Sequence, residues 1–159
     1  VKMAYGNGTW VVPDIGGTVR YSTNNMSSWS SSTPSGIGNA YYVIWNETDS
    51  QFVLCGGTFN GTDYDARIYT SDDGATWTAR ENGSKKILLL SVAGDDQGNY
   101  IAIGNGYSGG FFDTNNILYS TNSGVTWNEF TGPVTYDVEV GTRKIAYHAG
   151  TLRNIARSS

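Results

Sequence analysis

Cysteine and histidine are almost absent from this chain, which contains one of each among its 159 residues. A single cysteine cannot form an internal disulfide, and its position in the apolar run 52–55 predicts that Cys55 is a small buried hydrophobic residue. With His148 as the one histidine, a zinc site is not expected. The sequence also lacks a calcium-binding loop and a phosphate-binding glycine motif, so we predict neither a metal nor a cofactor.

Charge and long apolar runs are scarce as well. Charged residues make up 15% of the chain and the net charge is −4, which argues against nucleic acid or an anionic membrane surface as the main partner. No apolar run reaches the roughly 18 residues of a membrane span. The first residues do not follow a signal-peptide pattern. We therefore expect no membrane insertion.

Aromatic residues and glycine are what the chain contains in quantity. Aromatic residues account for 13% of the sequence and glycine for 21 positions, whereas proline occurs three times. A disordered chain would lack these aromatic residues. The composition and the length favour a single all-β domain that is rich in turns.

One motif occurs three times, at residues 21–29, 69–77 and 119–127, and each copy begins with tyrosine and ends with tryptophan. The successive tryptophans are 48 and 50 residues apart. A fixed period of this length is typical of repeat architectures, and four short strands per period favour a β-propeller.

A second element precedes each motif. At 7–12, 50–54 and 98–103 a polar turn leads into an apolar run, which predicts a hairpin that enters a buried strand. The continuous apolar runs 41–45 and 87–92 lie upstream and suit the innermost strand of a blade. Each repeat therefore has four predicted strands: the apolar run, the strand after the polar turn, a strand that ends at the tyrosine, and one that begins at the tryptophan.

These patterns predict one β-propeller region over residues 1–159. The predicted boundaries are 1–33 for strands two to four of a first blade, 38–82 for a second blade, 86–132 for a third blade, and 134–159 for a partial fourth repeat.

The number of repeats is lower than in a closed propeller. Residues 146–152 repeat the pattern of residues 4–10, so the chain holds about three blades, against the usual four to eight. Either a longer parent chain completes the ring, or copies of the chain self-associate, as two chains would in a six-bladed dimer. Both arrangements cover blade edges that would otherwise be prone to aggregation.

The repeated motif, Ser/Thr-x-Asp/Asn-x-Gly-x-Thr/Ser-Trp, resembles the Asp-box, or BNR repeat, of sialidase-like propellers. The resemblance implies that the box lies on the hairpin between strands three and four, away from the ligand-binding face. The residue types suit a structural role, because Asp or Asn accepts hydrogen bonds within its own turn, glycine allows positive φ, and tryptophan buries apolar surface. The aligned box residues are Asn24 and Trp29; Thr70, Asp72, Gly74, Thr76 and Trp77; and Asn122, Gly124, Thr126 and Trp127.

The sequence does not favour catalysis. A sialidase-like enzyme needs several arginines that grip a carboxylate, an acid/base aspartate and a tyrosine–glutamate pair. Arg20, Arg67 and Arg80 fall at different phases of the repeat, and the Arg-Ile-Pro segment of that family is absent. We predict no catalytic residue. The alternative is a fragment of a sialidase-like glycoside hydrolase, because glycoside hydrolysis uses a pair of carboxylates and any two acidic residues could lie close together in the fold.

The loops between strands two and three carry the candidate ligand-binding residues. Segments 56–65 and 104–113 are rich in glycine, yet they present aromatic side chains beside Asp and Asn, which suits the C–H faces and hydroxyls of a sugar ring. The alternative is that these aromatic residues pack under their own loops or against a neighbouring subunit. The candidates are Phe59, Asp63, Tyr64, Asp65, Tyr107, Phe111, Phe112 and Asp113.

The expected function is a non-catalytic recognition or structural module that binds a glycan or another protein. Low charge, abundant Gly, Ser, Thr and Asn, and degenerate boxes are similar to the repeats of bacteriophage tail and virion proteins. That likeness implies a virion or extracellular location.

Overall fold

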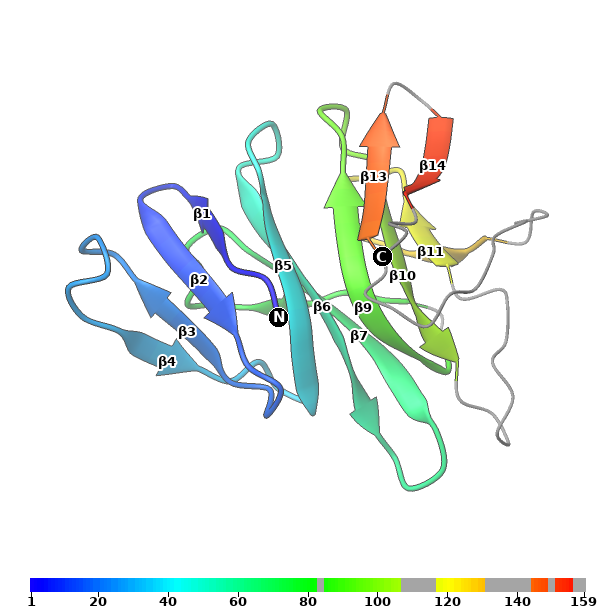
Figure 1. Cartoon of the computed structure of the whole chain (residues 1–159), viewed down its shortest axis with the longest axis horizontal. Helices are drawn as coiled ribbons and strands as arrows, with labels where there is room; N and C mark the ends of the chain where they lie inside the picture. Colours follow the sequence, from blue (N-terminus) through cyan, green and yellow to red (C-terminus); the bar gives the residue numbers. More distant parts are fainter. Residues whose placement is uncertain (83–84, 107–116, 131–143, 149–150, 156–159) are drawn as a thin grey trace.

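The computed structural model describes residues 1–82, 85–106, 117–130, 144–148 and 151–155 (Figure 1). Within these residues all regular structure is β, and it forms three four-stranded antiparallel sheets and one hairpin. Sheet 1 contains β1 (Ala4–Gly6), β2 (Thr9–Pro13), β3 (Val19–Ser22) and β4 (Ser30–Ser32). Sheet 2 contains β5 (Asn39–Asn46), β6 (Gln51–Phe59), β7 (Tyr64–Ser71) and β8 (Thr78–Ala79). Sheet 3 contains β9 (Ile87–Gly94), β10 (Tyr100–Gly106), β11 (Ile117–Ser120) and β12 (Asn128–Glu129). The hairpin pairs β13 (Lys144–His148) with β14 (Thr151–Ile155).

Each sheet is a meander in which consecutive strands pair, as the repeat pattern predicts. The fourth strand of every sheet begins directly after the tryptophan of the motif. For sheet 1 the sequence predicts only strands two to four, but the structure also has a first strand, Ala4–Gly6. This strand is too short to produce the long apolar run that marks β5 and β9.

The three sheets lie side by side, and their first strands adjoin one another (Figure 1). β5 contacts both β1 and β9, and β9 also contacts β13. At the start of the chain, Lys2 pairs with Tyr42 of β5 in a parallel bridge. This arrangement resembles successive blades that share an inner edge, with the fourth strand of each sheet outermost.

Every sheet has a leading face, which points toward the preceding sheet in the chain, and a trailing face, which points toward the following one. Strand β6 shows both, because its side chains alternate. Phe52 and Leu54 point toward sheet 1, whereas Val53 and Cys55 point toward sheet 3, and all four are fully buried. The prediction for Cys55 is confirmed, and burial raises the pKa of its thiol.

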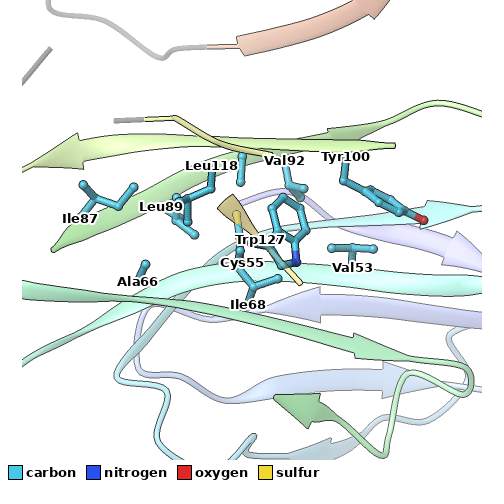
Figure 2. Close-up of a cluster of buried hydrophobic side chains, with 11 residues drawn as sticks. Val53, Cys55, Ala66, Ile68, Ile87, Leu89, Val92, Tyr100, Leu118 and Trp127 are labelled. Atoms are coloured by element: carbon cyan, nitrogen blue, oxygen red, sulfur yellow. The ribbon is translucent and has the colours of Figure 1, made fainter. Parts of the chain in front are cut away.

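Two hydrophobic clusters fill the spaces between the sheets. The cluster between sheets 1 and 2 is formed by Val11, Val19, Ile37, Ala40, Val43, Phe52, Leu54 and Tyr69. The cluster between sheets 2 and 3 is formed by Val53, Cys55, Ala66, Ile68, Ile87, Leu89, Val92, Tyr100, Ala102, Leu118 and Trp127 (Figure 2). Each fully buried aliphatic or aromatic side chain stabilises the fold by about 1.5–3 kcal/mol, so these inter-sheet clusters are the main source of stability.

A bulge recurs in the first strands of sheets 2 and 3. The register of β5 on β6 shifts at Tyr41, and that of β9 on β10 shifts at Leu90. Opposite these bulges lie Gly56 and Gly104, where a Cβ atom would come within 1.9 Å and 2.0 Å of a backbone oxygen. Glycine is therefore required at both positions, and the bulge re-aims the bulged side chain.

Candidate functional site

The loop between the third and fourth strands of each sheet is held by its own polar side chains. In box 1 (residues 22–29) the Oδ1 atom of Asn24 accepts a hydrogen bond from the Ser28 amide at 2.9 Å. In box 3 (residues 120–127) the Oδ1 atom of Asn122 accepts one from the Thr126 amide at 3.0 Å. Both asparagine oxygens are therefore engaged within their own loops.

Box 2 (residues 71–77) corrects the sequence alignment by one residue. Its amide hydrogen bonds are accepted by Asp73, whose Oδ1 atom lies 2.7 Å from the Thr76 nitrogen, rather than by Asp72. Asp72 is exposed, and its backbone oxygen accepts a hydrogen bond from the Asn7 side chain. Ser71, and not Thr70, faces the aromatic residue of the second strand, as Ser22 and Ser120 do.

The physical reason for this shift is that box 2 is one residue shorter than the other two. Boxes 1 and 3 have two consecutive residues at positive φ, Asn25–Met26 and Ser123–Gly124, whereas box 2 has only Gly74, at a φ of 75°. The missing residue moves the motif tyrosine by one position along its strand, which reverses the face to which it points. Tyr69 consequently lies in the cluster between sheets 1 and 2.

Hydrogen bonds within box 2 determine the ionisation of Asp73. Burial favours the neutral acid, but the amides of Thr76 and Ala75 and the hydroxyl of Ser71 donate to the carboxylate and outweigh it. The pKa of Asp73 therefore lies below its ordinary value. All three hydrogen bonds are accepted by Oδ1, and a carboxylate whose ionised form is favoured in this way is poorly suited to act as a general acid at neutral pH.

The three box tryptophans are buried to very different extents. Trp127 packs into the cluster between sheets 2 and 3 and is only 3% exposed, with its Nε1 donating to the Gly124 oxygen at 2.9 Å. Trp77 packs partly buried against the cluster between sheets 1 and 2. Trp29 is 41% exposed. Trp77 and Trp127 thus pack toward the preceding sheet, whereas Trp29 belongs to the first sheet of the described residues.

The candidate ligand-binding residues that the structure describes lie on the β6–β7 hairpin. Phe59 and Tyr64 are opposite each other in the strand register, and their ring centroids are 5.2 Å apart. Phe59 is 51% exposed and Tyr64 is half-buried. Between them, the Oδ1 atom of Asn60 accepts hydrogen bonds from the amides of Thr62 and Asp63. The aromatic pair is therefore presented on a braced turn.

Asp65 belongs to a small charged cluster beside the hairpin. Its Oδ1 atom accepts hydrogen bonds from Lys86 and, at 3.1 Å, from Asn60, while Arg67 lies 3.8 Å from Oδ2. The Lys86 hydrogen bond is the main cause that lowers the pKa of Asp65, against a smaller opposing effect of burial. These partners already satisfy much of the carboxylate, so Asp65 is better suited to orient the loop than to bind a ligand directly.

Asp63 is different, because one of its oxygens is buried without a partner. No described group donates a hydrogen bond to its Oδ1 atom, although the side chain as a whole is half-buried. A buried carboxylate oxygen in this state needs a donor from water or from a ligand. Because this oxygen is buried, a ligand could reach it only after a rearrangement of the turn.

Tyr41 is a residue of β5 that the sequence prediction omits. It is the bulged residue opposite Gly56. Burial, and then the electrostatic effect of Tyr64, raises the pKa of the Tyr41 phenol. Gly56, directly after the apolar run of β6, is the one feature of the sequence that is related to this bulge. A glycine alone does not predict a bulge in the partner strand.

The other four predicted site residues, Tyr107, Phe111, Phe112 and Asp113, lie outside the described residues. The arginines that a sialidase-like site would gather are engaged separately: Nε of Arg67 donates to the Gly36 oxygen, and Nε of Arg80 donates to Thr70 Oγ1. Within the described ranges no group of three or more His, Cys, Asp or Glu side chains could hold a metal ion. The same part of the chain contains no helix long and apolar enough to cross a membrane.

A scan of protein-family models finds no match for the sequence, and a search of curated proteins finds none either. The Asp-box resemblance therefore stays a prediction that rests on the motif residues and their period.

Proposed function

We propose that this chain is part of a β-propeller that recognises a ligand without catalysis. The three four-stranded sheets with adjoining first strands support the propeller, since this is the way in which blades surround a common axis. The boxes are structural in this proposal. They brace the hairpins between strands three and four, and Trp77 and Trp127 pack between neighbouring sheets.

The proposed ligand is a glycan, bound at the β6–β7 hairpin. The observation that carries this proposal is the aromatic pair on a braced turn, in which exposed Phe59 lies 5.2 Å from half-buried Tyr64 between ring centroids. An aromatic face stacks on the C–H face of a sugar ring, and a carboxylate accepts hydrogen bonds from sugar hydroxyls. A braced loop loses little conformational entropy on binding, which favours affinity.

A recognition role also agrees with the state of the nearby charges. Asp65 is bound to Lys86 and Asn60, and Arg67 donates to a backbone oxygen, so this cluster resembles a support for the loop more than a pair of reacting acids. In keeping with the composition, we place this binding module in a virion or another extracellular setting, where a glycan-bearing surface or a protein would be its partner.

The test is a pair of variants on a glycan array. Phe59→Ser with Tyr64→Ser removes both rings, and we expect loss of the array signals and at least a tenfold weaker dissociation constant in calorimetry, because aromatic anchors dominate such sites. Tyr119→Ser is the matched control. Tyr119 is an exposed aromatic residue on sheet 3, so its replacement should leave glycan binding unchanged.

Two results would contradict the proposal. The first is a folded wild-type chain that binds no glycan on the array. The second is a double variant that keeps its far-ultraviolet circular dichroism and binds as tightly as the wild type.

A further inference from the structure

The sequence contains four Asn-Gly dipeptides, at residues 7–8, 60–61, 82–83 and 105–106. Asn-Gly is prone to spontaneous deamidation, because glycine has no Cβ atom to hinder attack by its backbone nitrogen on the preceding side-chain amide. Two of the four dipeptides share the longer sequence Asn-Gly-Thr, at residues 7–9 and 60–62. Residue order therefore predicts nearly equal reactivity for Asn7 and Asn60, and a difference between them has to come from the fold.

Two of the four asparagines are held away from this reaction. The Asn82 side chain is buried, and its Nδ2 atom donates a hydrogen bond to the Ala66 backbone oxygen at 2.6 Å. Asn105 lies in β10, where it pairs with Leu88 of β9, and its Oδ1 atom is buried. Ring closure at a residue in a strand ladder would break the pairing, and burial excludes the water that the reaction consumes.

Asn60 is exposed, but its side chain is fixed at both ends. Its Oδ1 atom accepts hydrogen bonds from the amides of Thr62 at 3.1 Å and Asp63 at 3.0 Å. Its Nδ2 atom donates to Asp65 Oδ1 at 3.1 Å. Deamidation requires Cγ of Asn60 to turn toward the Gly61 nitrogen, so these three hydrogen bonds have to break first. The brace of the β6–β7 hairpin therefore also protects Asn60.

Asn7 is the least restrained of the four. It is exposed in the two-residue turn between β1 and β2. Among the described residues its side chain makes one hydrogen bond, from Nδ2 to the Asp72 backbone oxygen at 3.3 Å, which is at the long end of the usual range. A Cβ atom at Gly8 would meet no atom within 4 Å, so solvent reaches the backbone at this position. The fold thus leaves Asn7 accessible and mobile enough to react.

We propose that Asn7 is a site of spontaneous deamidation in the folded chain, and that the product loosens the packing of sheet 1 on sheet 2. Hydroxide removes the Gly8 amide proton, and the Gly8 nitrogen forms a bond to Cγ of Asn7. The Cγ–Nδ2 bond breaks, and Nδ2 leaves as ammonia with a proton taken from water. A water molecule then opens the succinimide ring at either carbonyl and gives aspartate or isoaspartate. The net reaction consumes one water and releases one ammonia, without oxidation or reduction.

The position of the turn explains why either product affects the packing of the sheets. A carboxylate oxygen replaces the Nδ2 donor, so two acceptors face each other where Asn7 now donates to Asp72. Isoaspartate also adds a methylene group to the main chain of a two-residue turn, which disturbs the pairing of Gly6 with Thr9. Gly6 is buried against sheet 2, where a Cβ atom would lie 1.9 Å from the Trp45 ring, so this strand has little room to shift. This proposal does not depend on the ligand proposed for the β6–β7 hairpin.

The first experiment incubates the folded 159-residue chain in mildly alkaline buffer. Peptide mapping with electron-transfer fragmentation follows each Asn-Gly site and distinguishes aspartate from isoaspartate. We expect Asn7 to convert roughly tenfold faster than Asn60 or more, because two additional hydrogen bonds restrain Asn60. The chain unfolded in guanidinium chloride is the matched control. Without the fold, the two Asn-Gly-Thr sites should convert at similar rates.

The second experiment uses Asn7→Asp, which reproduces one product of the reaction. We expect this variant to have a lower urea midpoint than the wild type at pH 7. The difference should shrink in acid, because a protonated carboxyl group can again donate to the Asp72 oxygen. Conversion of Asn7 in the folded chain that is no faster than that of Asn60 would overturn the proposed site. An Asn7→Asp variant with the wild-type midpoint at pH 7, together with an unchanged midpoint of the deamidated wild type, would overturn the proposed effect on packing.

Discussion

Box 1 and box 3 are nearly the same loop in two different surroundings. Both have a serine, an asparagine and a pair of positive-φ residues, and in both the asparagine side chain accepts an amide hydrogen bond near 3 Å. Trp127 is nevertheless buried, whereas Trp29 is exposed. Sheet 2 covers box 3, whereas no sheet among the described residues covers box 1. The motif therefore sets the shape of the loop, and the neighbouring sheet sets the energetic importance of its tryptophan.

The largest expected effect tests this comparison directly. Trp127→Ala leaves a cavity between sheets 2 and 3 and should lower the free energy of unfolding by about 3–5 kcal/mol. Trp29→Ala at the equivalent position should lower it by less than about 1 kcal/mol, because the side chain is already partly in water. Urea unfolding at a concentration where the chain is monomeric measures both values.

If the two substitutions lower the free energy of unfolding by similar amounts, then burial against the preceding sheet is not the reason that Trp127 stabilises the fold. Comparable slopes of free energy against urea are needed for the comparison, since a changed slope would indicate a change in the denatured or native state.

The second test concerns the one box that has a carboxylate. The pKa of Asp73 is lower in the folded chain than its ordinary value, so its contribution to stability is fully present above that value and is lost as the pH falls through the folded pKa. Asp73→Asn copies the asparagine of boxes 1 and 3 and does not titrate. We expect the wild type to exceed this variant in stability by about 1 kcal/mol at pH 7 and by less below about pH 4.

Thermal unfolding at several pH values measures this difference. Asp65 and Asp95 also have lowered pKa values, so the variant should still lose stability in acid, although less than the wild type does. A difference between wild type and variant that stays constant from pH 7 to pH 2 would show that ionisation of Asp73 does not stabilise box 2.

The same boxes show how far the sequence predicts the structure. The period of the tyrosine–tryptophan motif predicts the sheets and the order of their strands, because alternating apolar runs and polar turns dominate strand formation. Box 2 is where this reasoning errs. Thr70 and Ser71 are both possible hydroxyl residues, and Asp72 and Asp73 are both possible acceptors, so a gapless alignment hides the missing residue. Only the pairing of Ser71 with Phe52 reveals it.

The candidate ligand site is predicted less completely than the sheets. Phe59, Asp63 and Tyr64 share one hairpin and can be found from the sequence as an aromatic loop segment. Tyr41 lies in another strand, as the bulged residue opposite Gly56. The place of a bulge depends on how strands pair, which residue order alone does not determine.

The smallest expected effect compares the backbones of box 1 and box 3. Met26 has a φ of 66° and Gly124 one of 75°, a region that is unfavourable for a residue with a Cβ atom. Met26→Gly should therefore stabilise the monomer by about 0.5–1 kcal/mol, since relief of the backbone outweighs the greater flexibility of the unfolded chain. The reverse change in box 3, Gly124→Ala, should destabilise by a similar amount. Urea midpoints measure both. If Met26→Gly lowers the midpoint of the monomer, then the Met26 side chain contributes more contact energy within its own box than its exposed position indicates.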